Sequence, residues 1–199
     1  MEKVLITGGK GDIAVAIFNK IGSKYVVFRP NKDELNVTDL SSVENYFKFR
    51  GPFDLIINNA GSIHPKSLLE SQEDKWVQDI MINLVGVYYV SKKGLEQNSK
   101  AIIINIASTA AYAAYKDWGS YCSSKAAVVT FTKSMANDNF CAFAIAPGAV
   151  LTKFRDNFDL PNDNALDPND IAVVVEEIID GLYNPGDIVF YRKGEKKVL

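Results

Sequence analysis

The feature that most constrains the fold is the alternation of short apolar runs with longer amphipathic stretches along the chain. Continuous apolar strands separated by helices indicate a parallel sheet covered on both faces. We therefore predict an α/β fold: a doubly wound sheet of about seven mostly parallel strands with helices on both faces. The expected strands are 4–7, 25–28, 34–37, 54–58, 101–107, 141–146 and 187–191, and the expected helices are about 12–22, 40–49, 73–97, 121–137 and 167–181.

Length and composition limit the classes of protein that this chain can belong to. Its 199 residues, 47% of them hydrophobic, suit one domain over 1–199, and only the loop at about 153–168 lacks periodicity. The formal net charge is −2 and no basic block suggests nucleic-acid binding. The start "MEKVLITGG" lacks a leader, and no apolar run approaches the ~20 residues of a membrane span. We expect a cytoplasmic protein without membrane or nucleic-acid partners.

Few residues here could form a metal centre or a disulfide framework. Two cysteines, Cys122 and Cys141, stand outside any metal-ligand spacing, so no metal is expected. The single histidine, His64, lies beside a proline and is interpreted as a loop residue rather than a catalyst.

A glycine-rich turn follows the first expected strand. The stretch "TGGKGDIA" at 7–14 opens a helix. Glycines let the backbone approach a pyrophosphate, and a helix N-terminus offers N–H groups with a positive dipole end. The alternative is a tight strand-to-helix turn without a ligand, and the spacing departs from G-x-G-x-x-G.

Further motifs follow the later strands, at the edge where doubly wound sheets bind ligands. They are "NNAG" at 58–61, a strand ending at Ser108, "PGAVLT" at 147–152, and "INLVG" within the long helix. Together with the glycine turn and a Tyr-x-x-x-Lys pair, they make the chain resemble the short-chain dehydrogenase/reductase family over almost its whole length. The resemblance implies a Rossmann-type oxidoreductase that moves a hydride between a nicotinamide cofactor and a small carbonyl or alcohol substrate. It also implies a homodimer or homotetramer.

Four Tyr-x-x-x-Lys pairs occur, so position must decide which one is catalytic. The pair Tyr121/Lys125 begins a helix and follows Ser108 by thirteen residues, as the family arrangement requires. Residues at i and i+4 share one helix face. The remaining pairs lie inside the long helix or in an irregular stretch; they are Tyr88/Lys92, Tyr89/Lys93 and Tyr112/Lys116.

The resemblance assigns four catalytic residues. Tyr121 would be the general acid/base, and Lys125 would bind the nicotinamide ribose. The Lys125 charge is expected to lower the phenol pKa. Ser108 would donate a hydrogen bond to the substrate oxygen, and Asn83 would hold a water in a proton relay, a role compatible with bonding a neighbouring backbone.

Cofactor choice depends on the end of the second strand. An acidic residue there would bind the ribose of NAD, whereas an arginine would accommodate the phosphate of NADP. Here Arg29 follows Phe28, and Lys10 adds a second cation, so NADP is favoured and NAD is less expected; the alternative is that Asp33 or Glu34 touches the ribose. The implied cofactor-binding residues are Gly8, Lys10, Gly11, Asp12, Ile13, Arg29, Asn36, Val37, Asn59, Ala60, Gly61, Tyr121, Lys125, Pro147, Gly148, Val150 and Thr152.

Several positions depart from the family pattern. Asp12 replaces a glycine of the turn and could cap the helix, and Asn36 stands where an aspartate often touches adenine. The short C-terminal part suggests an open pocket, or one completed by a neighbouring subunit. Tyr112, Tyr115 and Trp118 could line it or simply pack over the sheet. Two rival functions stay open: a non-catalytic NAD(P)-binding redox sensor, and a sugar epimerase, which would usually carry a larger C-terminal domain.

Overall fold

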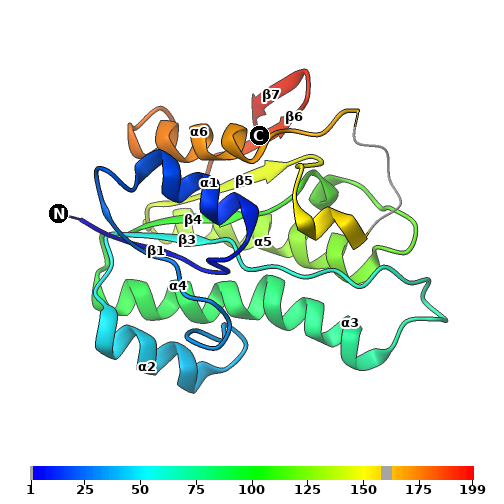
Figure 1. The fold of residues 1–199 in the computed structure, drawn as a ribbon, viewed down its shortest axis with the longest axis horizontal. Helices are drawn as coiled ribbons and strands as arrows, with labels where there is room; N and C mark the ends of the chain where they lie inside the picture. Colours follow the sequence, from blue (N-terminus) through cyan, green and yellow to red (C-terminus); the bar gives the residue numbers. More distant parts are fainter. Residues whose placement is uncertain (1, 158–162) are drawn as a thin grey trace.

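One sheet organises the part of the chain that the computed structural model describes, residues 2–157 and 163–199. Over these residues it has seven strands in the order β2-β1-β3-β4-β5-β6-β7 (Figure 1). The first six are mutually parallel, and β7 pairs antiparallel with β6. This confirms the predicted Rossmann-type, doubly wound α/β fold. The strands are β1 Lys3–Ile6, β2 Val26–Phe28, β3 Leu55–Asn58, β4 Ile102–Ile106, β5 Ala142–Pro147, β6 Ile188–Arg192 and β7 Glu195–Val198.

Helices cover both faces of the sheet. Figure 1 shows α1 and α6 on one face and α2, α4 and α5 on the other. Each face has its own core: α1 and α6 pack over one set of strand side chains, including Ile57 and Ile145, and α2 and α4 pack over another, including Ile56 and Ile103. The helices are α1 Asp12–Ile21, α2 Leu40–Arg50, α3 Glu73–Ile80, α4 Gly86–Gln97, α5 Gly119–Asn137 and α6 Pro168–Ile179.

The predicted helix over 73–97 contains a change of winding. A π-helical turn at Met81–Val85 joins α3 to α4, and Asn83 lies within it. Such turns often occur at functional sites because they redirect one side chain. Two 3-10 helices, Thr109–Tyr112 and Lys153–Asn157, follow β4 and β5. The predicted loop at 153–168 therefore begins with a helical turn, and its residues 158–162 lie outside the described residues.

The predicted strand at 34–37 was wrong. This segment forms consecutive turns, in which the Leu35 N–H donates to Asn31 O at 2.9 Å and the Thr38 N–H donates to Asn36 Oδ1 at 3.2 Å. Leu35 and Val37 are nevertheless buried in the core beside α2, which explains the strand-like alternation. Consequently β2 is an edge strand, and the seventh strand is the unpredicted β7, whose charged sequence contains no apolar run.

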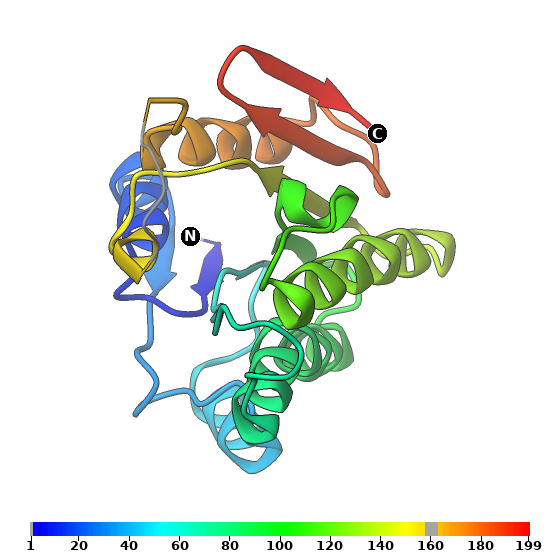
Figure 2. The same ribbon diagram turned by 90° about the vertical axis from the view of Figure 1, so that its right-hand side faces the viewer.

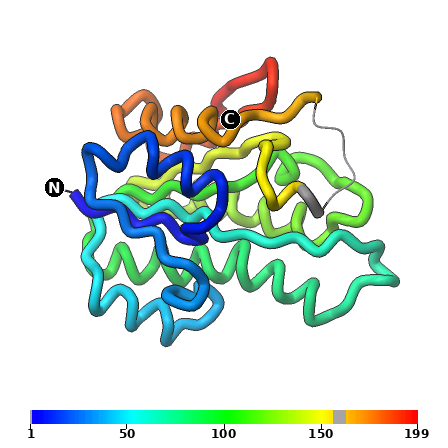
Figure 3. The backbone as a smooth tube through the Cα atoms, in the orientation of Figure 1, coloured from blue at the N-terminus to red at the C-terminus, as the bar shows by residue number. Residues whose placement is uncertain are grey.

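The carboxyl ends of the parallel strands all point to one side of the molecule. Figure 2 looks onto this side, where the turn after β1, the loop after β3, the 3-10 helix after β4 and the start of α5 meet. The tube in Figure 3 shows the chain between β3 and α3, and the segment after β5, extending to the same side. This is where a doubly wound sheet places its ligand.

Candidate active site

A cavity of about 710 Å³ opens at the carboxyl ends of β1, β3, β4 and β5. Most of the residues that the sequence predicts for catalysis and cofactor binding line it. They are Gly8, Lys10, Gly11, Asp12, Ile13, Asn59, Ala60, Gly61, Ser108, Tyr121, Lys125, Pro147, Gly148, Val150 and Thr152.

The glycine turn is tied to the loop after β3. The Thr7 hydroxyl oxygen accepts from the N–H groups of Asn59 and Ala60, each at 3.0 Å, and Asn59 Nδ2 donates to Thr7 O at 3.0 Å. Gly8 has a φ of 64°, which an L side chain rarely adopts, and a Cβ there would lie 3.0 Å from the Ala60 Cα. These bonds fix two walls of the cavity relative to each other.

The N-terminus of α1 faces the cavity without a side-chain cap. Gly11 is the N-cap residue, so the N–H groups of the first turn stay available to a phosphate group. The helix cap predicted for Asp12 was wrong, because its carboxylate instead accepts from the Lys153 N–H at 2.7 Å. The uncapped amides and the adjacent Lys10 are hydrogen-bond donors that fit a pyrophosphate, and the small residues of the turn let it come close to the backbone.

Gly9 should tolerate no side chain. A Cβ there would lie 2.3 Å from the Arg29 carbonyl oxygen and 2.7 Å from the Arg29 Cα, which are backbone atoms that cannot move aside. We expect Gly9→Ala to lower the free energy of unfolding by about 1–3 kcal/mol or more, measured by urea denaturation. Gly119→Ala is the control: its Cβ would meet only Trp76 Nε1 at 3.9 Å, so stability should hold or rise. Equal effects of the two variants would contradict this account.

Ser108, Tyr121 and Lys125 come together on one wall. The Lys125 ammonium donates to Ile106 O at 2.7 Å and lies 5.6 Å from the centre of the Tyr121 ring. Ser108 Oγ accepts from the Ala110 N–H at 3.1 Å and lies 3.4 Å from Pro147 O. That second contact is long for a hydroxyl donor, so the hydroxyl can readily turn its proton to a ligand.

Burial shifts the pKa values of Tyr121 and Lys125 in opposite directions. It raises the pKa of Tyr121 to about 12, an effect that a hydrogen bond from Ser108 partly offsets, and it lowers the pKa of Lys125 to about 8. We expected the Lys125 charge to lower the pKa of Tyr121, and this was wrong. The pKa of Tyr121 is raised instead, because its burial away from water is the largest effect on it. Near pH 7, Tyr121 is protonated and Lys125 is charged.

Asn83 is fully buried and makes structural hydrogen bonds. Its Oδ1 accepts from the Ser62 N–H at 2.9 Å, and its Nδ2 donates to Ser62 O at 2.8 Å and to Ser124 Oγ at 3.1 Å. Both amide protons are therefore used by the protein. Asn83 does not line the cavity, and the predicted relay role stays a prediction.

Three predicted cofactor residues also lie outside the lining of this cavity: Arg29, Asn36 and Val37. The Arg29 guanidinium donates to Gly9 O at 2.9 Å and lies 4.3 Å from the centre of the Phe18 ring. Asn36 Oδ1 accepts from Thr38 within its own turn. Val37 packs in the core, where a Cβ on Gly86 would lie 2.8 Å from Val37 Cγ2.

Aromatic side chains form one wall of the cavity. The rings of Tyr115 and Trp118 lie 5.2 Å apart, Trp118 and Tyr121 lie 5.8 Å apart, and Tyr121 and Phe154 lie 6.2 Å apart. Tyr112 instead packs on Phe190 at 5.9 Å, away from the cavity. Sequence reasoning missed Phe154, whose segment carries no regular pattern.

A buried polar network behind this wall was also missed. It joins Asp79 on α3 to the loop after β3 and to the start of α5. Asp79 is the one buried residue of α3, whose apolar Trp76 and Val77 are exposed, so no periodic pattern in the sequence pointed to it. His64 does lie in a loop, as predicted, yet its ring contacts Asp79. The other members are Ser62, Asn83, Ser120 and Ser124.

Two further properties concern the described ranges, 2–157 and 163–199, alone. No group of three or more histidine, cysteine or acidic residues there could hold a metal ion. Among the same residues, no helix has both the length and the apolar character that crossing a bilayer needs.

The sequence matches the family model of the short chain dehydrogenases over residues 32–162. The chain belongs to this family. It is accordingly an NAD(P)-dependent oxidoreductase.

Individual relatives agree with the family. An uncharacterized oxidoreductase of Staphylococcus aureus (strain MRSA252) is 28% identical over 202 residues, which covers 86% of this chain and 87% of the relative. A small-chain dehydrogenase in complex with NADPH has the same fold, with a TM-score of 0.88 and 20% identity over 97% of both chains. A 3-ketoacyl-(acyl-carrier-protein) reductase from Brucella melitensis complexed with NADH gives a TM-score of 0.83 and 21% identity, again over 97% of both chains.

Proposed function

We propose that this short-chain dehydrogenase reduces the carbonyl group of a small molecule with NADPH, and that Tyr121 donates the proton. The observation that carries the proposal is the convergence of Ser108, Tyr121 and Lys125 on one wall of the cavity, opposite the glycine turn. A module that only sensed a nucleotide would need the turn but not this set.

The protonation of the site favours reduction near neutral pH. A phenol with a pKa raised to about 12 keeps its proton, so it is ready to donate to a carbonyl oxygen as negative charge develops there. Ser108 can donate a second hydrogen bond to that oxygen. Lys125 holds a positive charge beside the phenol and would bind the ribose hydroxyls of the cofactor. When bound, the reduced nicotinamide would supply the hydride.

The aromatic wall supports a substrate with an apolar or planar part. Rings of Tyr115, Trp118 and Phe154 offer face and edge contacts beside Tyr121, and Ile63 adds aliphatic surface to the lining. A carbonyl carbon held against this wall would have its oxygen near both hydroxyl donors. The reducible group and the apolar part together define the substrate class that we propose.

Arg29 supports NADP rather than NAD. Its contacts with Gly9 O and the Phe18 ring hold the guanidinium beside the glycine turn. Within 2–157 and 163–199, no carboxylate pairs with it, so donors remain for a phosphate group.

We expect Arg29→Gln to raise the KM for NADPH about tenfold to a hundredfold, since a charge-assisted hydrogen bond contributes about 1.5–3 kcal/mol. The KM for NADH should change little. Steady-state assays with the two cofactors in parallel measure both values. Wild-type protein that uses NADH as well as NADPH, or better, would overturn the assignment of Arg29.

Self-association is the remaining part of the proposal. Apolar side chains on α3 and α4, including Val77 and Tyr88, are exposed to solvent. We propose that they contribute to a homodimer or homotetramer. Light scattering after gel filtration tests this, and a monomer at micromolar concentration would contradict it.

A further inference from the structure

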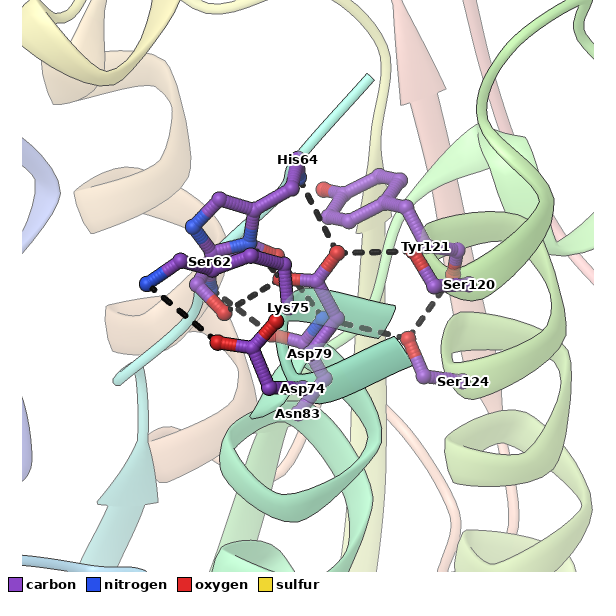
Figure 4. Close-up of polar contacts among 9 residues, drawn as sticks. All are labelled: Ser62, His64, Asp74, Lys75, Asp79, Asn83, Ser120, Tyr121 and Ser124. Atoms are coloured by element: carbon purple, nitrogen blue, oxygen red, sulfur yellow. Dashed lines mark hydrogen bonds and ion pairs between the residues drawn. The ribbon is translucent and has the colours of Figure 1, made fainter. Parts of the chain in front are cut away.

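Asp79 is a fully buried carboxylate that the proposed chemistry does not use. It lies on α3 at 0% exposure, behind the catalytic wall. Figure 4 shows it between the loop after β3, which carries Ser62 and His64, and the first turn of α5, which carries Ser120 and Tyr121. Burying a charge lowers stability unless hydrogen bonds compensate it, so we examined the hydrogen bonds of the Asp79 carboxylate.

Four donors from two separate segments converge on this carboxylate. Oδ1 accepts from Ser62 Oγ at 2.7 Å and from His64 Nδ1 at 2.8 Å. Oδ2 accepts from the His64 N–H at 3.0 Å and from Ser120 Oγ at 2.7 Å. Because an ionised carboxylate only accepts, the proton of the His64 ring lies on Nδ1.

The same arrangement repeats one helical turn later. Asn83, four residues after Asp79, bonds both backbone groups of Ser62 and the hydroxyl of Ser124. Ser120 directly precedes Tyr121, and Ser124 directly precedes Lys125. Asp79 and Asn83 thus join Ser120 and Ser124 to the loop at 62–64. That loop directly follows the cavity-lining residues at 59–61.

We infer that Asp79 is a positioning residue. By holding Ser120 and the loop at 62–64 together, it fixes the Tyr121 hydroxyl relative to the cavity lining at 59–61. This inference rests on the proposed function. A single hydroxyl on a helix N-terminus has little to restrain it, whereas a carboxylate with donors from both sides restrains both segments at once. Displacement of a reacting group by about 1 Å can cost on the order of a hundredfold in rate.

The charge of Asp79 also acts on Tyr121. The ionisable groups around the carboxylate, among the described residues, include His64 from the loop after β3 and Tyr121 from α5, with Cys122 next to Tyr121 and Lys125 one turn further along α5. Lys75 precedes Asp79 by one turn on α3 itself (Figure 4). The negative charge of Asp79 is among the causes that raise the pKa of Tyr121, after burial. Loss of the charge should therefore make the phenol slightly more acidic, which a purely structural role would not do.

The test is Asp79→Asn, which keeps the shape but replaces one acceptor oxygen by a donor. We expect kcat for carbonyl reduction to fall about tenfold to a hundredfold. The Kd for NADPH, followed by cofactor fluorescence, should change little. In the alcohol-oxidation direction, the rise of kcat with pH should shift to lower pH. Ser120→Ala, which removes one donor, should reproduce part of the kcat loss.

Lys75→Gln is the matched control, since Lys75 lies on the same helix and its ammonium, among the residues that the structure describes, pairs with the exposed Asp74 at 3.9 Å. It should leave all three measurements unchanged. Wild-type rates in both Asp79→Asn and Ser120→Ala would overturn the inference, as would a lowered kcat with an unshifted pH profile. If wild-type protein itself reduces no carbonyl, the proposed function fails instead, so the two failures are distinguishable.

Discussion

Tyr121→Phe should lower kcat for carbonyl reduction by about a hundredfold to ten-thousandfold, the range that general acid catalysis contributes. The variant removes only the hydroxyl that donates the proton. The ring contacts with Trp118 and Phe154 remain, so the wall of the cavity should keep its shape. The measurement is the loss of reduced-cofactor absorbance with a panel of carbonyl compounds, with NADPH binding measured separately.

Tyr112→Phe is the matched control for this variant. Tyr112 heads another Tyr-x-x-x-Lys pair, and its pKa is also raised by burial, but its ring packs on Phe190 away from the cavity. It should retain wild-type turnover. Turnover that survives in Tyr121→Phe with little loss would show that the acid/base role belongs to another group.

Lys125→Met should lower kcat/KM about a hundredfold to a thousandfold, comparable to removing one preorganised electrostatic donor from an active site. The methionine fills much of the same space but cannot bind ribose hydroxyls or place a charge beside Tyr121. Steady-state kinetics measure the loss. Lys92→Met is the control, because Lys92 is exposed and pairs with Glu96, so its rates should match those of the wild type.

The same variant tests how the buried ammonium affects stability. Burial lowers the pKa of Lys125 from 10.5 to about 8, so between these values the unfolded chain holds a proton that the folded chain has released. Stability therefore rises with pH across this window. Relative to Lys125→Met, the free energy of unfolding of the wild type should increase by about 2 kcal/mol from pH 7 to pH 9.5. Parallel pH dependences from urea denaturation would contradict a buried, charged Lys125.

The sequence predicted the central strands because each is a continuous apolar run in a sheet buried on both sides. The prediction of strands failed near the two edges of the sheet. Leu35 and Val37 alternate as strand residues do, but turns satisfy the backbone around them and only their side chains enter the core. The opposite error occurred at β7, where exposed charged residues pair with β6.

Motif order predicted that Ser108, Tyr121 and Lys125 would lie close together, because residues that follow neighbouring parallel strands meet at one edge of the sheet, and the three do line one cavity. The electrostatics could not be predicted in the same way. Spacing showed that Lys125 lies beside Tyr121, but not that both are largely removed from water, and this reverses the direction of the phenol pKa. The Asp79 network depends on donors from segments far apart in the chain, which no local pattern reveals.

A deuterium label followed from reduced cofactor to product shows directly whether the protein transfers a hydride to a carbonyl group. NADPH carrying deuterium at the transferring position of the nicotinamide is supplied with a panel of carbonyl compounds, and the alcohol is examined by NMR. We expect one deuterium on the carbinol carbon for each cofactor oxidised by the wild type, and almost none with Tyr121→Phe although NADPH still binds. Tight NADPH binding without transfer to any carbonyl, as a redox sensor would show, or undiminished transfer by Tyr121→Phe, would contradict this expectation.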